Sequence, residues 1–258
     1  MRAVQGDVRL TNVDCLAASE SVAEGDARLT RHGESTGGGI MRYELLGPLR
    51  ILDGDVAVVI STQKIQVLLA ALLIRADQVV AADHLITEIW GDAPPSRAQA
   101  GLHVYVSQLR KTLNLMGSPI VTRPPGYMLR LGTAECDFHT FLRLINAGRE
   151  CAREGRWENA IHCFGRALFL WRGSALGNGP RGPIAEAFIA WLNEARRECV
   201  EMLVDAYLRL GRFGDMGLRL CSLLAGHPFQ EDFSHHLKLA LCRVEQQIGA
   251  PRGARGCS

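Results

Sequence analysis

Residues 83–131 read DHLITEIWGDAPPSRAQAGLHVYVSQLRKTLNLMGSPIVTRPPGYMLRL, and this stretch decides the fold. A short helical pattern over Asp83–Trp90 is stopped by Gly91–Pro95. A longer amphipathic pattern then runs from Ser96 to about Leu115. The spacing therefore predicts two helices joined by a tight break, the second of them the longer.

A hairpin is expected directly after the longer helix. Two β-prone runs, Ile120–Arg123 and Tyr127–Leu131, flank the turn signal Pro124-Pro125-Gly126. Upstream, Ser61 or Thr62 caps a helix that reaches about Arg75. Three short β-prone runs precede that helix, and they are Tyr43–Leu46, Leu49–Leu52 and Val56–Ile60. The order βββ-α-α-α-ββ predicts a winged helix over residues 41–132.

The remainder of the chain has helical periodicity throughout. The expected helices are Phe138–Glu154, Trp157–Trp171, Ile184–Leu210, Phe213–Leu224 and Gln230–Gln247. Gly155-Arg-Trp157 and Gly211-Arg-Phe213 begin two similar stretches, a weak repeat like that of tetratricopeptide helix pairs. We therefore expect a mainly α protein with a small β content, in which an all-α domain over 136–247 follows the winged helix. Its last helix pair looks shortened, and residues 1–40 and 248–258 are expected to be a flexible leader and a disordered tail.

Composition excludes several classes of protein. The chain has 258 residues, 47% of them hydrophobic and 22% charged, with no apolar run long enough to span a membrane. Its eight cysteines contain no Cys-x-x-Cys pair, which argues against a disulfide framework or a zinc site and favours a reducing cytoplasm. Gly177–Gly182 matches G-x-G-x-x-G, but helical patterns flank it. We predict no enzyme activity, no cofactor and no metal.

The charge distribution is more informative than the net charge of +2. No Asp or Glu occurs between Ala93 and Ala134, where the basic residues are Arg97, Arg110, Lys111, Arg123 and Arg130. This surplus of +5 falls on the long helix and the hairpin, the two elements that a winged helix presents to DNA. The plain alternative is a solvated basic face.

The long helix also has a distinctive exposed face. With Leu102 at the centre of the buried side, the opposite side holds Arg97, Ala100, His103, Val104, Ser107, Gln108 and Lys111. An apolar Val104 on a polar face suits the methyl group of thymine in a major groove, whereas the alternative is that it packs on a neighbouring element. Arg97, Lys111 and Arg110 are candidates for phosphate or guanine contacts.

Several motifs resemble the OmpR-type winged helix. They are Leu46-Gly47-Pro48-Leu49, Leu85-Ile-Thr-Glu-Ile-Trp-Gly91, Pro94-Pro95, Val104-Tyr-Val-Ser-Gln-Leu-Arg110 and Val121-Thr-Arg-Pro-Pro-Gly-Tyr127. In the second half, Leu170-Trp-Arg-Gly173 and Gly211-Arg-Phe213 look like the bacterial transcriptional activation domain. The pairing resembles the SARP family, the Streptomyces antibiotic regulatory proteins, over about residues 41–243.

The resemblance implies a pathway-specific activator of a secondary-metabolite gene cluster that binds direct repeats in double-stranded DNA and recruits RNA polymerase. The residues that it assigns to DNA are Arg97, Gln99, His103, Val104, Ser107, Gln108, Arg110, Lys111, Arg123 and Tyr127, with Arg123 reaching a minor groove. Those that it assigns to polymerase are Trp90, Gly91, Asp92, Pro94 and Pro95. Gln99, Ala100 and Gln108 depart from residues common in the family, so we expect modest affinity for one site and self-association on tandem repeats.

A second interpretation stays open on the residues alone. The helical repeat could make the chain a scaffold for other proteins, with the winged helix as a docking module. The stretch without acidic residues favours DNA over this alternative.

Overall fold

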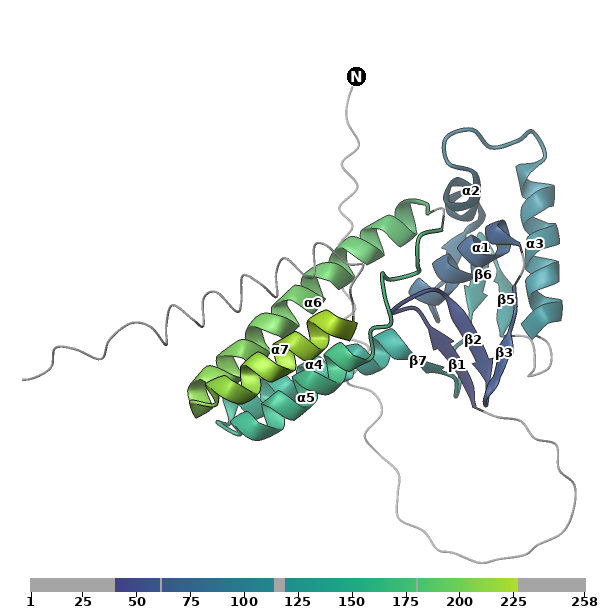
Figure 1. The fold of residues 1–258 in the computed structure, drawn as a ribbon. Helices are drawn as coiled ribbons and strands as arrows, with labels where there is room; N and C mark the ends of the chain where they lie inside the picture. Colours follow the sequence, from purple (N-terminus) through teal and green to yellow (C-terminus); the bar gives the residue numbers. More distant parts are fainter. Residues whose placement is uncertain (1–39, 61, 114–118, 180, 227–258) are drawn as a thin grey trace, which may run out of the picture. The chain divides into compact units, whose positions relative to one another are not determined.

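A computed structural model describes residues 40–60, 62–113, 119–179 and 181–226 (Figure 1). The expectations for the leader, for a helix over Gln230–Gln247 and for the C-terminal tail lie outside the described residues. The predicted fold class is confirmed: a winged helix precedes a domain built of helices.

The described chain opens with the three predicted strands, which form an antiparallel sheet. Strands β1 (Met41–Glu44), β2 (Arg50–Asp53) and β3 (Val56–Val58) follow one another, and Tyr43 pairs with Ile51. A fourth strand, β7 (Glu135–Cys136), lies parallel to β1 and was not predicted, because two residues carry no periodic signal.

Three helices and a second sheet complete the winged helix. The helices are α1 (Gln63–Ile74), α2 (Ala82–Trp90) and α3 (Ala98–Leu113). The predicted hairpin is present as β5 (Ile120–Arg123) and β6 (Gly126–Leu129), and the unpredicted strand β4 (Val80–Ala81) pairs with β6. Figure 1 shows α3 on the outer side of this domain with the hairpin beside it.

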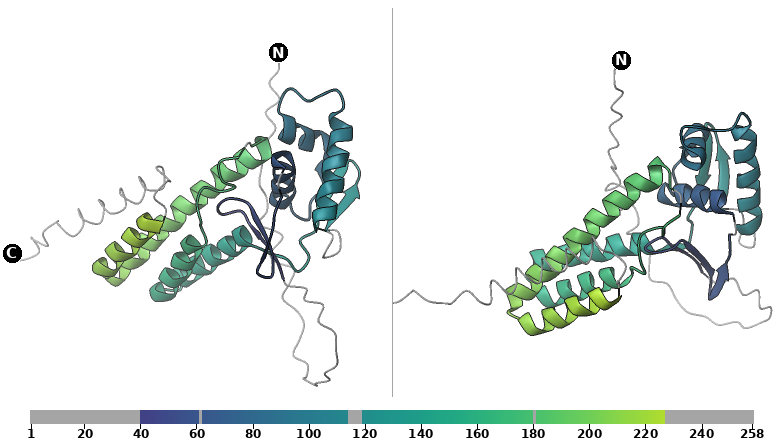
Figure 2. Two further views of the ribbon diagram at one scale, coloured as in Figure 1. Left: turned by 45° about the vertical axis from the view of Figure 1, so that its right-hand side comes forward. Right: turned by 45° about the horizontal axis from the view of Figure 1, so that its top comes forward.

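Four long helices form the described part of the second domain. They are α4 (Asp137–Arg153), α5 (Trp157–Phe169), α6 (Pro183–Leu210) and α7 (Phe213–Gly226), and both views of Figure 2 show them side by side. The two glycines of the weak repeat follow α4 and α6, where Gly155 and Gly211 have φ angles of 74° and 67°. Glycine adopts this left-handed conformation without a steric cost, so both helices end where the repeat predicts. No described helix is long and apolar enough to cross a membrane.

A first set of polar contacts joins the two domains at the start of α4. The Asp137 carboxylate accepts hydrogen bonds from the backbone N–H groups of Leu45 and Leu46 at 2.7 and 2.9 Å. The Arg172 guanidinium lies 3.6 Å from the same carboxylate and 3.4 Å from that of Glu44. Burial raises the pKa of Asp137, although the two amides and Arg172 oppose the shift. The loop after β1 is therefore held by residues about 90 positions and more along the chain.

A second joint is the buried carboxylate of Glu88, which is only 4% exposed. It accepts hydrogen bonds from the backbone N–H groups of Gly182, Ile184 and Ala185 at 3.2, 2.7 and 3.0 Å. Pro183 has no N–H, so the Glu88 carboxylate accepts a hydrogen bond from every backbone N–H group between Gly182 and Ala185. A Cβ on Gly182 would lie 2.5 Å from the Glu88 carboxyl carbon, so the close approach requires glycine. Helix α2 thus supplies the cap of a helix in the other domain.

Replacing Glu88 by alanine tests this cap. Glu88→Ala should lower the free energy of unfolding by roughly 3 kcal/mol, because three buried N–H groups lose a charged acceptor. Urea unfolding of the full chain measures the difference. The matched control is Glu186→Ala, which removes an exposed carboxylate from the same helical turn and should cost less than about 1 kcal/mol. Equal losses for the two variants would contradict the assignment.

Candidate nucleic-acid interface

Helix α3 divides into a buried and an exposed face, as predicted. The buried residues are Ala98, Leu102, Val106, Leu109 and Leu113. The exposed residues include Gln99, Ala100, His103, Val104, Ser107, Gln108 and Lys111, and Arg97 just before the helix is exposed too. The side chain of Val104 is 52% exposed, which removes the alternative that it packs on a neighbouring element. The helix therefore presents a polar surface with one apolar residue in it.

Tyr127 supports this surface from behind. Tyr127 is only 7% exposed, and its ring contacts that of His103 edge-on at a centroid distance of 6.4 Å. The prediction placed Tyr127 among the contact residues. The structure corrects this placement, because β6 turns the side chain toward the core beneath α3.

Arg110 also has a different place from the one expected. Its Nε donates to the carbonyl oxygen of Ile120 at 3.0 Å, and its Nη2 donates to the Thr122 hydroxyl at 2.8 Å. Its guanidinium lies 5.9 Å from the centre of the Tyr127 ring. These contacts tie α3 to β5, so Arg110 fixes the angle between helix and hairpin rather than pointing freely outward.

The hairpin holds Arg123 at the edge of the same surface. Arg123 is exposed, and it pairs through the backbone with Gly126 across the turn. A Cβ on Gly126 would lie 1.9 Å from the carbonyl oxygen of Val80, so only glycine allows β4 to pack against the base of the turn. The unpredicted strand β4 thus anchors the hairpin.

The cations of this surface are not paired with carboxylates in the part of the chain that the structure describes. None of the basic residues between Ala93 and Ala134 forms an ion pair with a carboxylate of the described ranges. The helical domain differs, since most of its surface arginines are paired, for example Arg149 with Glu198 at 3.0 Å. A field of one sign that is not neutralised internally attracts a polyanion.

Trp90, which was predicted to contact polymerase, lies at the start of the loop before α3. The Trp90 ring stacks on Tyr105 at a centroid distance of 5.7 Å, and the Lys64 ammonium lies 5.2 Å from its centre. Trp90 is therefore half-buried against α1 and α3 and positions the loop. The exposed residues of this loop are Gly91, Asp92, Pro94 and Pro95.

The residues that join the domains were not predicted from the sequence. Glu88 was quoted only within a motif, yet it lies three positions after Leu85, on the same buried face of α2. An acid on an apolar helical face was the available signal. Asp137 and Arg172 gave no comparable signal, because their partners are distant in the sequence.

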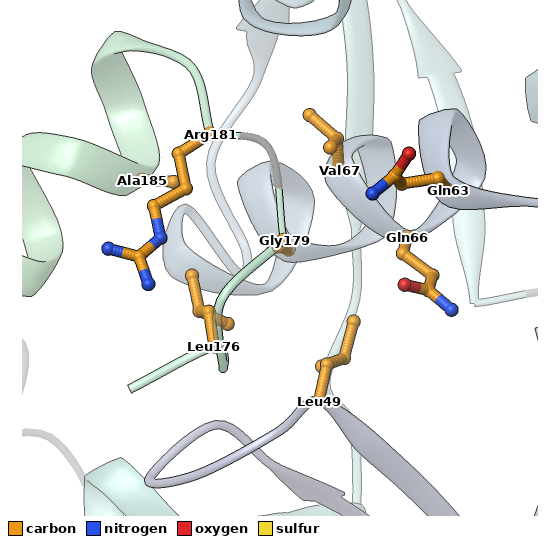
Figure 3. Close-up of a pocket in the computed structure, with 9 residues that line it drawn as sticks. Leu49, Gln63, Gln66, Val67, Leu176, Gly179, Arg181 and Ala185 are labelled. Atoms are coloured by element: carbon orange, nitrogen blue, oxygen red, sulfur yellow. The ribbon is translucent and has the colours of Figure 1, made fainter. Parts of the chain in front are cut away.

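A small cleft lies where the loop before α6 passes α1 (Figure 3). Gln63 and Gln66 of α1 line it with Leu176 and Arg181 of the loop. Its volume is about 40 Å³, room for a few water molecules but far below the roughly 300 Å³ of ordinary ligand sites. This cleft is therefore part of the contact between domains and does not fit a metabolite.

A winged helix with an unneutralised cationic face, followed by a helical domain, defines a DNA-binding regulator of transcription. Comparison with known proteins agrees with this class. The family described as "Transcriptional regulatory protein, C terminal" matches residues 57–129, and the family described as "Bacterial transcriptional activator domain" matches residues 136–251.

Individual relatives share both domains. Transcriptional regulatory protein MoaR1 of Mycobacterium tuberculosis is 32% identical over 84% of this chain and 71% of its own length. Regulatory protein AfsR of Streptomyces coelicolor is 35% identical over 82% of this chain, which corresponds to 21% of AfsR. The solved structure of M. tuberculosis EmbR in complex with a low-affinity phosphopeptide superposes with a TM-score of 0.58 and 26% identity, over 80% of this chain and 65% of EmbR. The chain belongs to the SARP family of transcriptional regulators, which are DNA-binding activators.

Removing the hairpin arginine tests the interface. Arg123→Ala should weaken DNA binding by about 1–3 kcal/mol, because the hairpin holds this side chain outward, where it can enter a minor groove. Fluorescence anisotropy with a promoter duplex at moderate salt measures the change. Arg166→Ala removes the same charge from an exposed position on α5 and should leave affinity unchanged. An unchanged affinity for Arg123→Ala would remove Arg123 from the interface.

Proposed function

We propose that the protein is a pathway-specific activator of a secondary-metabolite gene cluster, which acts in the cytoplasm and has no catalytic activity of its own. It binds direct repeats near promoters and recruits RNA polymerase. The observation that carries the proposal is the exposed face of α3 with the hairpin beside it, whose cations lack an acidic partner among the described residues.

The exposed face of α3 reads the major groove. His103, Ser107 and Gln108 offer hydrogen-bonding groups to base edges, and the half-exposed Val104 offers an apolar contact to a thymine methyl. Arg97 and Lys111, at opposite ends of the face, hold the phosphate backbone. Arg110 and Tyr127 act indirectly, since they fix the helix relative to the hairpin.

The loop over residues 91–95 contacts polymerase. Asp92, Pro94 and Pro95 are exposed there, directly after α2. The same α2 carries Glu88, which caps α6 of the helical domain. A winged helix bound to DNA therefore presents the loop and the activation domain to polymerase in a fixed relation.

Two copies bind side by side on direct repeats. One α3 covers only part of a helical turn and gives limited specificity by itself. Gln99 and Ala100 add no charge to its N-terminal turn, so the affinity of a single copy is modest. Repeats spaced by one turn place each copy on the same face of the duplex, where weak contacts between copies gain from high effective concentration.

A gel-shift experiment on the promoters that flank the gene tests the function as a whole. We expect a specific complex that unlabelled promoter DNA displaces and that random DNA does not. Absence of any specific complex, with the helical domain still capturing a protein partner, would favour the scaffold interpretation.

Salt dependence tests the electrostatic part. Four or five phosphate contacts per copy should make the logarithm of affinity fall with the logarithm of salt concentration, at about −0.9 per contact. Titrations between low and physiological salt give the slope. Arg97→Ala should reduce the slope by about one unit, and Arg166→Ala should leave it unchanged. A flat response would contradict the role of the cationic face.

Rotation of one repeat tests tandem binding. An insertion of five base pairs between repeats turns one site by about half a helical turn, so cooperative binding and activation should both be lost. An insertion of ten base pairs is the control, because it returns both repeats to the same face of the duplex while it lengthens the distance between them. If the half-turn insertion leaves binding and activation intact, tandem binding through this surface is wrong.

A further inference from the structure

One exposed side chain of α3 is in contact with a ring from a different element. The ring of His103 lies edge-on to that of Tyr127, and their centroids are 6.4 Å apart, within the range of favourable aromatic contacts. His103 is exposed, whereas Tyr127 of β6 is buried. In the part of the chain that the structure describes, no other exposed side chain of α3 has a hydrogen bond, an ion pair or a ring contact.

Tyr127 is itself held in place by the hairpin. The Arg110 guanidinium lies 5.9 Å from the centre of its ring. Two hydrogen bonds of 3.0 and 2.8 Å tie that guanidinium to Ile120 and Thr122 of β5. The backbone of Tyr127 also pairs with Thr122 across the hairpin. The ring that His103 contacts is therefore fixed by two neighbouring strands.

This contact matters for specificity because ordering a side chain costs free energy. An exposed side chain loses rotamer freedom when it binds a base edge, and a side chain that is already ordered in the free protein loses less. Ser107, Gln108 and Lys111 share the exposed face but have no such contact within the described ranges. His103 therefore has the lowest ordering cost among the hydrogen-bonding side chains of this face.

The chemistry of the imidazole ring favours one base. A histidine ring directs an N–H donor toward a base edge. The major-groove edge of guanine presents two acceptors, N7 and O6, whereas adenine places an amino donor beside its N7. Cytosine and thymine offer no comparable pair of acceptors. An N–H donor in a fixed position therefore fits guanine better than the other three bases.

We propose that His103, oriented by Tyr127, is the specificity-determining residue of α3 and donates a hydrogen bond to a guanine in the major groove of each repeat. This inference rests on the proposed DNA-binding function and names the base that the site selects. Tyr127 is a positioning residue, because its buried ring acts through His103.

Replacement of single base pairs tests the choice of base. Each base pair of the bound repeat in the promoter duplex is changed in turn, and competition measured by fluorescence anisotropy gives the affinity of the full chain for each duplex. The unmodified chain should prefer G·C at one position by about tenfold, and His103→Ala should lose this preference. The control is Arg166→Ala on α5, which should retain the whole pattern of preferences.

Replacement of Tyr127 tests the positioning role. Tyr127→Leu keeps an apolar side chain beneath α3 but removes the ring, so it should lose the preference at the same G·C pair and keep the preferences at other positions. Tyr127→Phe retains the ring and should retain the preference. Added to His103→Ala, the Tyr127→Leu change should cost nothing further at that pair, because the two residues act as one unit.

The unmodified chain gives an independent measurement of the same role. Side-chain NMR relaxation of the free protein should show the His103 ring to be as ordered as buried aromatic rings. The matched control is His84, which is exposed on α2 and has no ring contact within the described ranges. Its ring should be more mobile than that of His103.

The results that would overturn each part are different. Retention of every preference by His103→Ala would remove this residue from base recognition, although a specific complex would still support the proposed function. A loss at a pair other than G·C would contradict the choice of guanine. A His103 ring as mobile as that of His84, or an equal loss at all positions in Tyr127→Leu, would contradict the positioning role. Absence of any specific complex would overturn the proposed function and this inference with it.

Discussion

The carboxylate of Glu88 is the contact on which the arrangement of the protein depends. A helix begins with N–H groups that no residue of its own can satisfy, and burial makes each unsatisfied group costly. Helix α6 begins in a buried place, and three of its first amides bind a carboxylate from α2 of the winged helix. The start of the longest described helix of the activation domain is thus completed by the DNA-binding domain.

In the second joint, the activation domain supplies the carboxylate and the winged helix supplies the N–H groups. Asp137 of the activation domain accepts hydrogen bonds from two amides after β1, and the Arg172 guanidinium lies between the carboxylates of Asp137 and Glu44. Apolar contacts continue between the joints, since one core of buried residues extends from Tyr43 through α1 and α3 to Leu203 of α6. Each domain therefore supplies polar groups that the other needs.

The sequence was sufficient to predict what local periodicity controls. The face of α3 follows from helical spacing, so Val104 and Lys111 were predicted on the exposed side and lie there. Glycines after α4 and α6 were readable because helix ends have a local conformational requirement. The cationic surplus was readable because it is a property of one continuous stretch.

The features that were not predicted all depend on contacts with elements distant in the sequence. Strands β4 and β7 have two residues each and exist only because β6 and β1 pair with them. Arg110 was expected to face DNA, but a hydroxyl and a carbonyl of β5 bind its guanidinium. Tyr127 was expected at the surface, but the sheet turns it inward. No single-residue pattern distinguishes these alternatives, because each depends on which element packs opposite.

Calorimetric unfolding of the full chain tests most directly the claim that the two domains form one cooperative unit. If the contacts of Glu88 and Asp137 and the shared core join the domains, heating should give a single transition. Its van't Hoff enthalpy should equal the calorimetric enthalpy. Two resolved transitions, or a van't Hoff enthalpy near half of the calorimetric value, would show that the domains unfold independently and would contradict the account.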